Sequence, residues 1–411
     1  MQDKNQYTPE LRFPEFHDDW QVKRLGECFE MLRNGANYDT NNKDGYPMTR
    51  IETISTGNIN YDRVGFSVTE KKDYKLKKGD ILFSHINSYE HIGKLAYYND
   101  DRPLYHGMNL LLLRCIKEYA SLFIFYLLGT KHLKIKYQAV AKKAVNQCSI
   151  STKELSNLQL YLPTLPEQRK IALCLSSLDD LIKSVGDKIE LLKQHKKGLM
   201  QKLFPKKDCN VPELRFPEFS GNWQVQRLGE FFIERNEHSV ITKDLPLLSF
   251  TIEEGIIYPE NKKTNKRDFL IKDKDNKKYL IVRHNDILYN PANVIYGAIH
   301  RNDLCDGVVS PIYKIFYTKQ DALFMGYYVR KNELIQRMTI FMEGSVQKLK
   351  TLKPESFLKL DICIPSSLAE QRKIAECLSS LDAEIEQYEQ KLQMLQQHKK
   401  GLMQRMFVRR V

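Results

Sequence analysis

Apolar residues recur with a heptad spacing in two stretches, one in the middle of the chain and one near its C-terminal end. From Ile171 onward they follow at alternating steps of four and three residues, the period of helices that pair along a narrow seam. Pro166 and Pro365 stand just before the two stretches and are typical of helix starts. We therefore predict two long coiled-coil helices. The predicted core positions are Ile171, Leu175, Leu178, Ile182, Val185, Ile189 and Leu192 in the first, and Ile374, Leu378, Leu381, Ile385, Tyr388, Leu392 and Leu395 in the second.

The two helices belong to a tandem duplication. The string PELRFPEF begins at Pro9 and again at Pro212, and a Trp, RLGE, EQRKIA and QHKKGLMQ recur at the same separation. Between these repeated segments the copies share little beyond short echoes such as GDILFS and NDILYN. The two copies therefore have a common frame, and each frame encloses a different variable block.

A long apolar seam requires a partner helix. The two helices can pair with each other, with copies on a second chain, or with helices of a different protein. Tandem copies related by a two-fold axis place their helices head to tail, so we expect an antiparallel pair within the chain. A parallel homodimer is the main alternative.

The variable blocks carry both strand and helix patterns. β-Branched and aromatic residues between Gly and Asn turns predict strands in residues 46–69, and residues 121–141 and 321–338 each predict a helix with an apolar face. The fold class is therefore α+β: a tandem pseudo-two-fold repeat of two mixed α/β domains separated by an antiparallel coiled coil. The predicted boundaries are 1–163 and 207–366 for the two domains, 164–206 for the central helix and 367–411 for the C-terminal helix.

The charge balance favours a polyanionic partner. Lys and Arg number 64 against 51 Asp and Glu, a formal charge of +13, and basic side chains gain affinity for nucleic acid by releasing its condensed counterions. A basic surface that only keeps the protein soluble is the alternative. No apolar run approaches the ~20 residues that span a bilayer. The N-terminus lacks an apolar segment and the eight cysteines form no C-x-x-C pair, so we expect a cytoplasmic protein with reduced thiols and no membrane partner.

Polar and basic residues in the variable blocks offer the donors and acceptors that match DNA phosphates and base edges. A turn residue or the solvated face of a helix is the alternative for each of them. No phosphate loop, dinucleotide loop, zinc-binding helix or nucleophile elbow is present, so we predict neither catalytic nor metal-binding residues. The candidate DNA-binding residues are Ser84, His85, Asn87, Ser88, Lys94, Lys142, Lys143, Asn146 and Gln147 in the first block, and Asn290, Asn293, Tyr296, His300, Arg301, Gln347 and Lys348 in the second.

With these motifs the chain resembles the specificity (S) subunits of Type I restriction-modification systems. The resemblance covers nearly the whole chain. It is carried by PELRFPEF, a Trp and LGE before each variable block, by Leu162-Pro163 and Ile364-Pro365, and by EQRKI at the start of each long helix, in a duplicated order.

The resemblance implies two target-recognition domains, each reading one half of an asymmetric, bipartite site on double-stranded DNA. It also implies that the chain is not itself an enzyme. In the family, two methyltransferase (M) subunits modify adenine with S-adenosylmethionine, and two restriction (R) subunits cleave unmodified DNA with ATP and Mg²⁺.

Two other classes of function stay open at this point. One is an autonomous DNA-binding or scaffold protein that dimerises through its coiled coil. The other is a nuclease or methyltransferase whose site carries no recognised motif.

Overall fold

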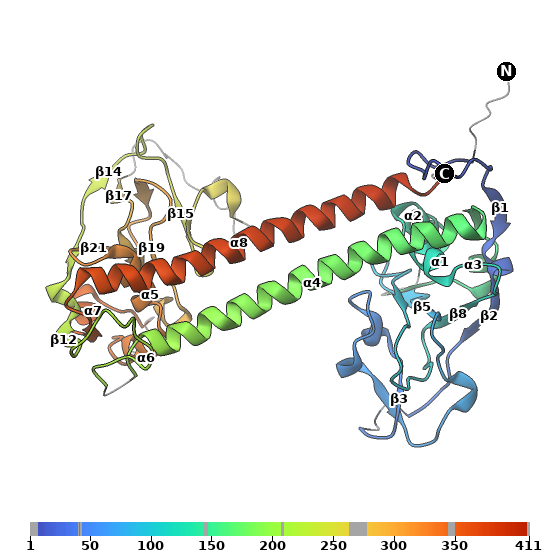
Figure 1. Ribbon diagram of the computed structural model, residues 1–411, viewed down its shortest axis with the longest axis horizontal. Coiled ribbons are helices and arrows are strands. Elements are labelled where there is room, and N and C mark those ends of the chain that lie inside the picture. Colours follow the sequence, from blue (N-terminus) through green and yellow to red (C-terminus); the bar gives the residue numbers. More distant parts are fainter. Residues whose placement is uncertain are drawn as a thin grey trace. The chain divides into compact units, whose positions relative to one another are not determined.

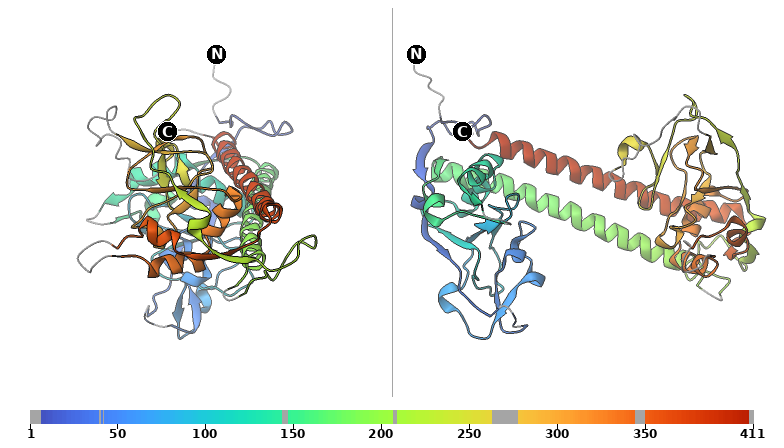
Figure 2. Two further views of the ribbon diagram at one scale, coloured as in Figure 1. Left: turned by 90° about the vertical axis from the view of Figure 1, so that its left-hand side faces the viewer. Right: turned by 180° about the vertical axis from the view of Figure 1, so that it is seen from behind.

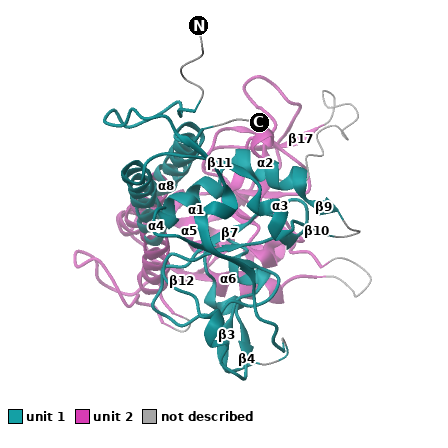
Figure 3. Cartoon of the chain, turned by 90° about the vertical axis from the view of Figure 1, so that its right-hand side faces the viewer, with its two compact units in different colours: residues 1–187, 388–411 teal, residues 188–387 magenta. Residues whose placement is uncertain are grey.

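The computed structural model of the chain describes residues 7–39, 41, 43–143, 147–206, 209–262, 278–343 and 350–408. The chain divides into two compact units (Figure 3): unit 1 comprises residues 1–187 and 388–411, and unit 2 comprises residues 188–387. The two long helices are α4 (Leu165–Leu203) and α8 (Leu368–Arg405) (Figure 1). Each unit therefore contains one half of each long helix. No helix in the described ranges is long and apolar enough to cross a membrane.

Within each unit the two helix halves run antiparallel (Figure 2). In unit 1, Ile171 near the start of α4 shares a core cluster with Met406 beyond the end of α8, and Asp179 pairs with Lys399. In unit 2, Leu203 at the end of α4 shares a core cluster with Ile374 near the start of α8. The expected antiparallel pair is confirmed. Helix α4 begins before Pro166 rather than after it, because a proline in the first turn costs no helical hydrogen bond.

The heptad positions form the inner face of both helices. None of the fourteen predicted core residues is exposed, and Leu175, Val185, Ile189 and Leu378 are among those that are buried. Apolar residues off the seam are exposed instead, as Leu173 is with 66% of its surface accessible. The seam therefore accounts for the heptad pattern without a second chain.

The two variable blocks have the same sheet topology, although their sequences differ. Unit 1 has an antiparallel sheet in the order β2-β8-β5-β7, and unit 2 has one in the order β13-β21-β18-β19. The echoed strings supply the corresponding inner strands β5 and β18. A two-stranded sheet closes each block, β1 with β11 and β12 with β22. This common topology explains the mixed α/β composition of both blocks and confirms the α+β class.

Short strands and helices complete each unit. The strands of unit 1 are β1 (Gln21–Arg24), β2 (Phe29–Asn34), β3 (Tyr46–Met48), β4 (Gly65–Ser67), β5 (Ile81–Phe83), β6 (Ile86–Asn87), β7 (Leu95–Tyr97), β8 (Leu111–Cys115), β9 (Lys142–Lys143), β10 (Cys148–Ser149) and β11 (Gln159–Leu162). Those of unit 2 are β12 (Gln224–Arg227), β13 (Phe232–Glu234), β14 (His238–Ser239), β15 (Ser249–Thr251), β16 (Gly255–Ile257), β17 (Tyr279–Val282), β18 (Ile287–Tyr289), β19 (Ile299–Arg301), β20 (Gly307–Val309), β21 (Lys314–Thr318) and β22 (Asp361–Ile364).

Each predicted apolar helix is in fact two helices. The segment 121–141 forms α1 (Ser121–Leu128) and α2 (Lys131–Val140), and the segment 321–338 lies in α5 (Ala322–Val329) and α6 (Asn332–Ile340). In unit 1 the break falls at Gly129-Thr130, where the Thr130 hydroxyl accepts a hydrogen bond from the Leu133 N–H and caps α2. The other helices are α3 (Thr152–Ser156) and α7 (Pro354–Leu358).

A buried carboxylate joins the frame together in each unit. In unit 1, Glu167 near the start of α4 has only 1% of its side chain exposed and accepts two hydrogen bonds of 2.8 Å from Arg12. The Trp20 indole N–H donates to the same carboxylate at 3.4 Å. Unit 2 repeats this Arg–Glu–Trp contact: Arg215 donates twice to Glu370, both at 2.8 Å, and the Trp223 indole donates at 3.1 Å.

The residue after each buried glutamate ties the variable block to the long helix. The Gln168 side chain donates to the Pro163 carbonyl at 2.9 Å and accepts from the Ala120 N–H, at the start of α1, at 3.0 Å. Gln371 makes the matching contacts with Pro365 and Asp321 in unit 2. The repeated EQ pair is therefore the junction of frame, block and helix.

The repeated PELRF segment also holds the far end of the antiparallel helix. The Leu11 N–H donates to the Arg405 carbonyl of α8 at 2.9 Å in unit 1, and the Leu214 N–H donates to the Lys202 carbonyl of α4 at 2.9 Å in unit 2. Each bond satisfies a carbonyl that a helix end leaves without an intrahelical donor. One short segment thus contacts the start of one helix and the end of the other.

Replacing Arg12 with Met tests the buried contact. The substitution leaves the Glu167 carboxylate buried without a cation, so we expect the free energy of unfolding of unit 1 to fall by about 3 kcal/mol. The double variant Arg12→Met/Glu167→Gln removes the charge and keeps an acceptor for the Trp20 indole, so it should recover roughly half of that decrease. Scanning calorimetry of the full chain measures both.

Lys170→Met is the matched control, because Lys170 pairs with Glu15 at a half-exposed site. It should cost less than about 1 kcal/mol. Equal destabilisation by the single and the double Arg12 variants would contradict the role given to the buried charge.

Candidate functional site

The candidate residues that follow β5 lie in two different environments. Ser84 and His85 are buried, with 0% and 7% of their surfaces exposed, and burial lowers the pKa of His85 to about 4. We therefore remove both from the candidate surface, because a buried side chain cannot reach a base edge. Asn87 is half-buried and donates to the Ser84 hydroxyl at 3.0 Å, whereas Ser88 is exposed and bonds the His91 ring at 2.7 Å.

A small sheet brings two separate sets of candidates together in unit 1. Strand β10 pairs with β6 on one side and β9 on the other, so that Cys148 lies opposite both Asn87 and Lys143. Lys142 and Lys143 are exposed, and the Lys143 ammonium lies 4.8 Å from the centre of the Tyr89 ring. The loop after β6 and the basic strand β9 thus share one surface. Gln147 is exposed next to them, and Asn146 lies outside the described residues.

The candidates of unit 2 cluster around the turn between β18 and β19. The Asn290 side chain accepts hydrogen bonds from the backbone N–H groups of Ala292 and Asn293 at 3.0 and 3.3 Å, which makes it a turn residue. Asn293 and Tyr296 are exposed, Tyr296 to 68%. Asn290 and Asn293 also line a cavity of about 750 Å³ with Lys314 and Lys353. Gln347 and Lys348 lie outside the described residues.

The side chains of the two candidates on β19 bond other residues of unit 2. His300 has 5% of its surface exposed, its ring bonds the Ile252 carbonyl at 2.7 Å, and burial lowers its pKa to about 4. It is therefore also removed from the candidate surface. Arg301 pairs with Asp303 and keeps 15% of its side chain exposed. The exposed candidates of unit 2 are thus Asn293 and Tyr296, with Arg301 at the edge.

A tyrosine, an aspartate and a lysine connect each variable block to both long helices, and sequence reasoning missed them. In unit 2 the Tyr327 hydroxyl donates to Asp382 at 2.6 Å, and Lys196 donates to the same carboxylate at 2.6 Å. Unit 1 repeats the set with Tyr126, Asp179 and Lys399. The aspartate and the lysine on the long helices recur at the separation of the two repeats, but the tyrosines of the variable blocks do not. The repeat therefore did not reveal the tyrosines.

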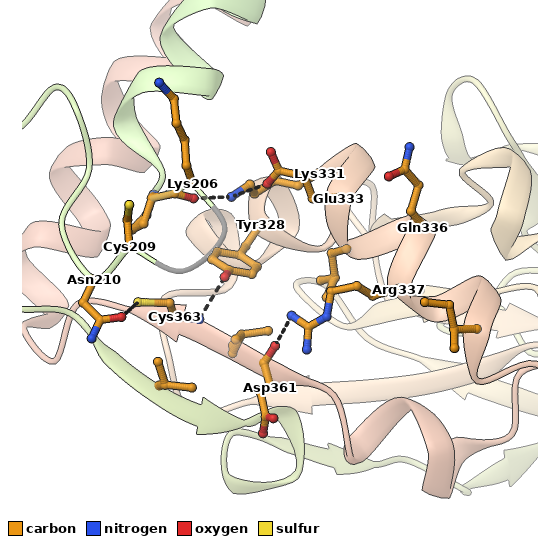
Figure 4. A pocket seen from close by; sticks show the side chains of 15 residues that line it. Lys206, Cys209, Asn210, Tyr328, Lys331, Glu333, Gln336, Arg337, Asp361 and Cys363 are labelled. Atoms are coloured by element: carbon orange, nitrogen blue, oxygen red, sulfur yellow. Dashed lines mark hydrogen bonds and ion pairs between the residues drawn. The ribbon is translucent and has the colours of Figure 1, made fainter.

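A cavity of about 540 Å³ beside β22 shows how the two units differ in detail (Figure 4). Two of its polar side chains bond the backbone of β22: the Tyr328 hydroxyl accepts from the Cys363 N–H at 2.9 Å, and Arg337 donates to the Asp361 carbonyl at 2.6 Å. At the corresponding place in unit 1, Tyr7 stacks on Tyr161 with ring centres 5.5 Å apart. No described side chain that lines this cavity is a nucleophile hydrogen-bonded to a neighbouring base.

Across the described ranges, no group of three His, Cys, Asp or Glu side chains is placed to hold a metal ion.

Comparison with known proteins gives the family. The family model of the Type I restriction modification DNA specificity domain matches residues 17–194. A putative type I restriction enzyme specificity subunit, MjaX of Methanocaldococcus jannaschii, is 34% identical over 414 residues, covering 95% of this chain and 93% of the relative. The MjaVIII specificity subunit of the same organism is 24% identical over 434 residues, covering 97% and 95%.

The fold agrees with that relationship. The crystal structure of the S subunit of a Type I restriction-modification system from M. genitalium matches with a TM-score of 0.60 at 16% identity, covering 98% of this chain and 100% of that one. This chain belongs to the family of Type I restriction-modification specificity subunits.

Buried histidines make the stability of the fold depend on pH. His85, His106 and His300 each have a pKa lowered to about 4 by burial, whereas an unfolded histidine titrates near pH 6.5. Between these values the unfolded chain binds protons that the folded chain does not. The free energy of unfolding should therefore fall as the pH decreases from 6.5 to 4, by about 1.4 kcal/mol per pH unit for each histidine.

Urea unfolding at pH 7.5, 6 and 5 measures this slope. In a His106→Asn variant, this slope should be smaller by about 1.4 kcal/mol per pH unit, the contribution of one histidine. His195→Asn, at an exposed position on α4, should leave the slope unchanged. The same slope in the His106 variant and in the wild-type chain would refute this assignment.

Proposed function

We propose that this specificity subunit recognises an asymmetric, bipartite site on double-stranded DNA, one half with each variable block, and directs partner subunits to it. The observation that carries the proposal is the combination of a repeated frame with different loop chemistry. Arg12, Trp20 and Glu167 have equivalents in unit 2 with the same hydrogen bonds, whereas the exposed candidates differ between the units. Equal frames with unlike reading surfaces fit a site whose two halves differ.

The exposed surfaces of the blocks have the chemistry that DNA recognition requires. In unit 1, Ser88, Lys142, Lys143 and Gln147 combine phosphate-binding cations with side chains that offer donors and acceptors. In unit 2, Asn293 and Tyr296 give an amide and a large aromatic ring on one turn. Both sets lie next to antiparallel sheets that hold the loops in place, which preorganised recognition requires.

The same duplication supports two copies of each partner subunit. A surface on the frame occurs twice, so that a methyltransferase subunit has two equivalent places to bind. Leu191 and Met394 are equivalent positions of the repeat on α4 and α8, and each has 63% of its surface exposed. We propose that two M subunits methylate adenine with S-adenosylmethionine, that two R subunits cleave unmodified DNA with ATP and Mg²⁺, and that this chain supplies recognition alone.

The alternative function, an autonomous protein that dimerises through its coiled coil, requires an apolar seam that a second chain must cover. Its premise was an uncovered seam, but within each unit the seam of one helix half packs on the other half, and Ile171, Leu175, Ile374 and Leu378 are buried. No second chain is needed to cover these positions.

A domain exchange tests the division of labour. Residues 31–150 are replaced by the corresponding block of a relative, and the chimaera is co-expressed with the methyltransferase subunit. The frame residues that hold the block, Arg12, Trp20, Glu167 and Gln168, lie outside the exchanged segment, so the chimaera should fold and assemble. One half of the methylated motif should change and the other should persist, as read by sequencing that detects modified adenines.

The matched control exchanges residues 234–348 instead, which should change the opposite half. Changes in both halves from either single exchange would count against independent recognition by the two blocks.

A further inference from the structure

A basic cavity lies between α4 and the break between α5 and α6 in unit 2. Its volume is about 390 Å³. Met200, Phe204 and Tyr327 form its apolar part. Five cationic side chains line it against a single carboxylate, that of Glu333; the cations are Lys193, Lys196, Lys197, Arg330 and Lys331. The excess of positive charge identifies an anion as the matching ligand.

Two of these cations are in ion pairs, and within the described residues two others are not. Asp382 pairs with Lys196, and Glu333 pairs with Lys331. For the side chains of Lys197 and Arg330, the described part of the chain offers no hydrogen-bonding or ion-pair partner. Burial lowers the pKa of Arg330, although the carboxylates of Asp382 and Asp303 oppose this effect. An anion in the cavity would compensate both charges.

Unit 1 has a basic cavity at the equivalent place, with a volume of about 300 Å³. Tyr126, Gly129, Lys399 and Met403 line it, and they correspond to Tyr327, Arg330, Lys196 and Met200 of unit 2. Its other cations come from different elements: Lys94 from the loop before β7 and Lys134 from α2. None of the described residues that line this cavity carries a carboxylate. Both units therefore place positive charge at the same point of the fold, with one equivalent lysine and otherwise different cations.

We propose that each cavity binds phosphate groups of the DNA backbone beside the half-site that its unit reads, an inference that rests on the proposed function. Lysine acts on phosphate as a point charge, so the site tolerates cations from different elements, whereas a ligand held by fixed geometry would not. Apart from the equivalent pair Lys196 and Lys399, the two units supply the positive charge with different residues, which binding to a DNA backbone allows.

The positions of the candidate reading residues favour DNA over a free anion. Lys94 lines the basic cavity of unit 1 and also a second cavity, of about 140 Å³, that Asn87 and His91 line. In unit 2, Arg330 interacts electrostatically with Asp303, the partner of Arg301. A phosphate in either cavity would thus lie close to candidate reading residues, Asn87 in unit 1 and Arg301 in unit 2.

The experiment uses the full chain in complex with its methyltransferase subunit and a fluorescent duplex that contains the methylated site. Fluorescence anisotropy gives the dissociation constant at several salt concentrations. Lys197→Gln/Arg330→Gln should weaken binding and lower the slope of log Kd against log salt by about two, about one for each phosphate that the variant no longer neutralises. Lys134→Gln should lower the slope by about one. The methylated motif should stay the same in both variants.

Lys400→Gln is the matched control. Lys400 is the repeat equivalent of Lys197 on α8 and is also exposed, but it does not line the cavity of unit 1. Its affinity and salt slope should equal those of the wild-type complex. Circular dichroism and the thermal midpoint confirm that each variant is folded.

Three results would overturn the proposal. In the first, the double variant binds the duplex with the wild-type affinity and slope. In the second, inorganic pyrophosphate stabilises the wild-type chain and not the double variant while DNA binding is unchanged, which assigns the cavity to a free phosphate. In the third, the double variant fails to assemble with the methyltransferase subunit, which assigns the cavity to an acidic protein surface. A wild-type complex that does not bind the site at all would instead refute the proposed function.

Discussion

The repeated frame of each unit depends on one interaction, the pairing of a buried glutamate carboxylate with an arginine. Glu167 and Glu370 are almost completely removed from water, so each must keep a cation and further donors at hydrogen-bonding distance. Arg12 and Arg215 supply the charge, and Trp20 and Trp223 supply the indole donors. The arginine and the tryptophan come from one short segment, and the glutamate lies 155 residues after the arginine. Their contact therefore fixes where the chain enters each unit and where each long helix starts.

This constraint leaves the variable blocks free to differ. Gln168 and Gln371 bond backbone atoms at the start of α1 and α5, so they hold the block whatever side chains it carries there. A single tyrosine in each block adds a bond to an aspartate on a long helix. Among the exposed candidate reading residues in the described ranges, only Lys142 pairs with a side chain outside its variable block, Glu154 at 3.6 Å, so the chemistry of these loops can change while the fold persists. The contacts of the frame thus permit different loops on the same support.

The sequence was most informative where a pattern repeats. The heptads of α4 and α8 and the duplicated strings predicted the helices, their pairing and the α+β class, because periodicity and identity are visible without homologues. The shared topology of the two blocks was not visible, since only the echoed strands β5 and β18 carry similar letters. The single helix predicted in each variable block is two helices. The sequence did not reveal the break, because a helix that stops and restarts within one apolar segment keeps its overall pattern.

The candidate site was predicted less well for a physical reason. Ser84, His85 and His300 have side chains of the kind that read bases, but Ser84 and His85 follow the buried strand β5 and His300 lies within β19. A residue type does not reveal which way its side chain points. Lys197 and Arg330 were missed because a lysine on a helix and an arginine at a helix end are ordinary on any surface. Only the folded chain places them in one cavity.

The most direct test of the central claim is to co-express this chain with the methyltransferase subunit of its system and to map modified adenines across a genome. The account predicts a split motif with two unlike halves and a fixed gap, present only when this chain is expressed. Methylation at the same sites without the chain, or a motif with one contiguous half only, would contradict it.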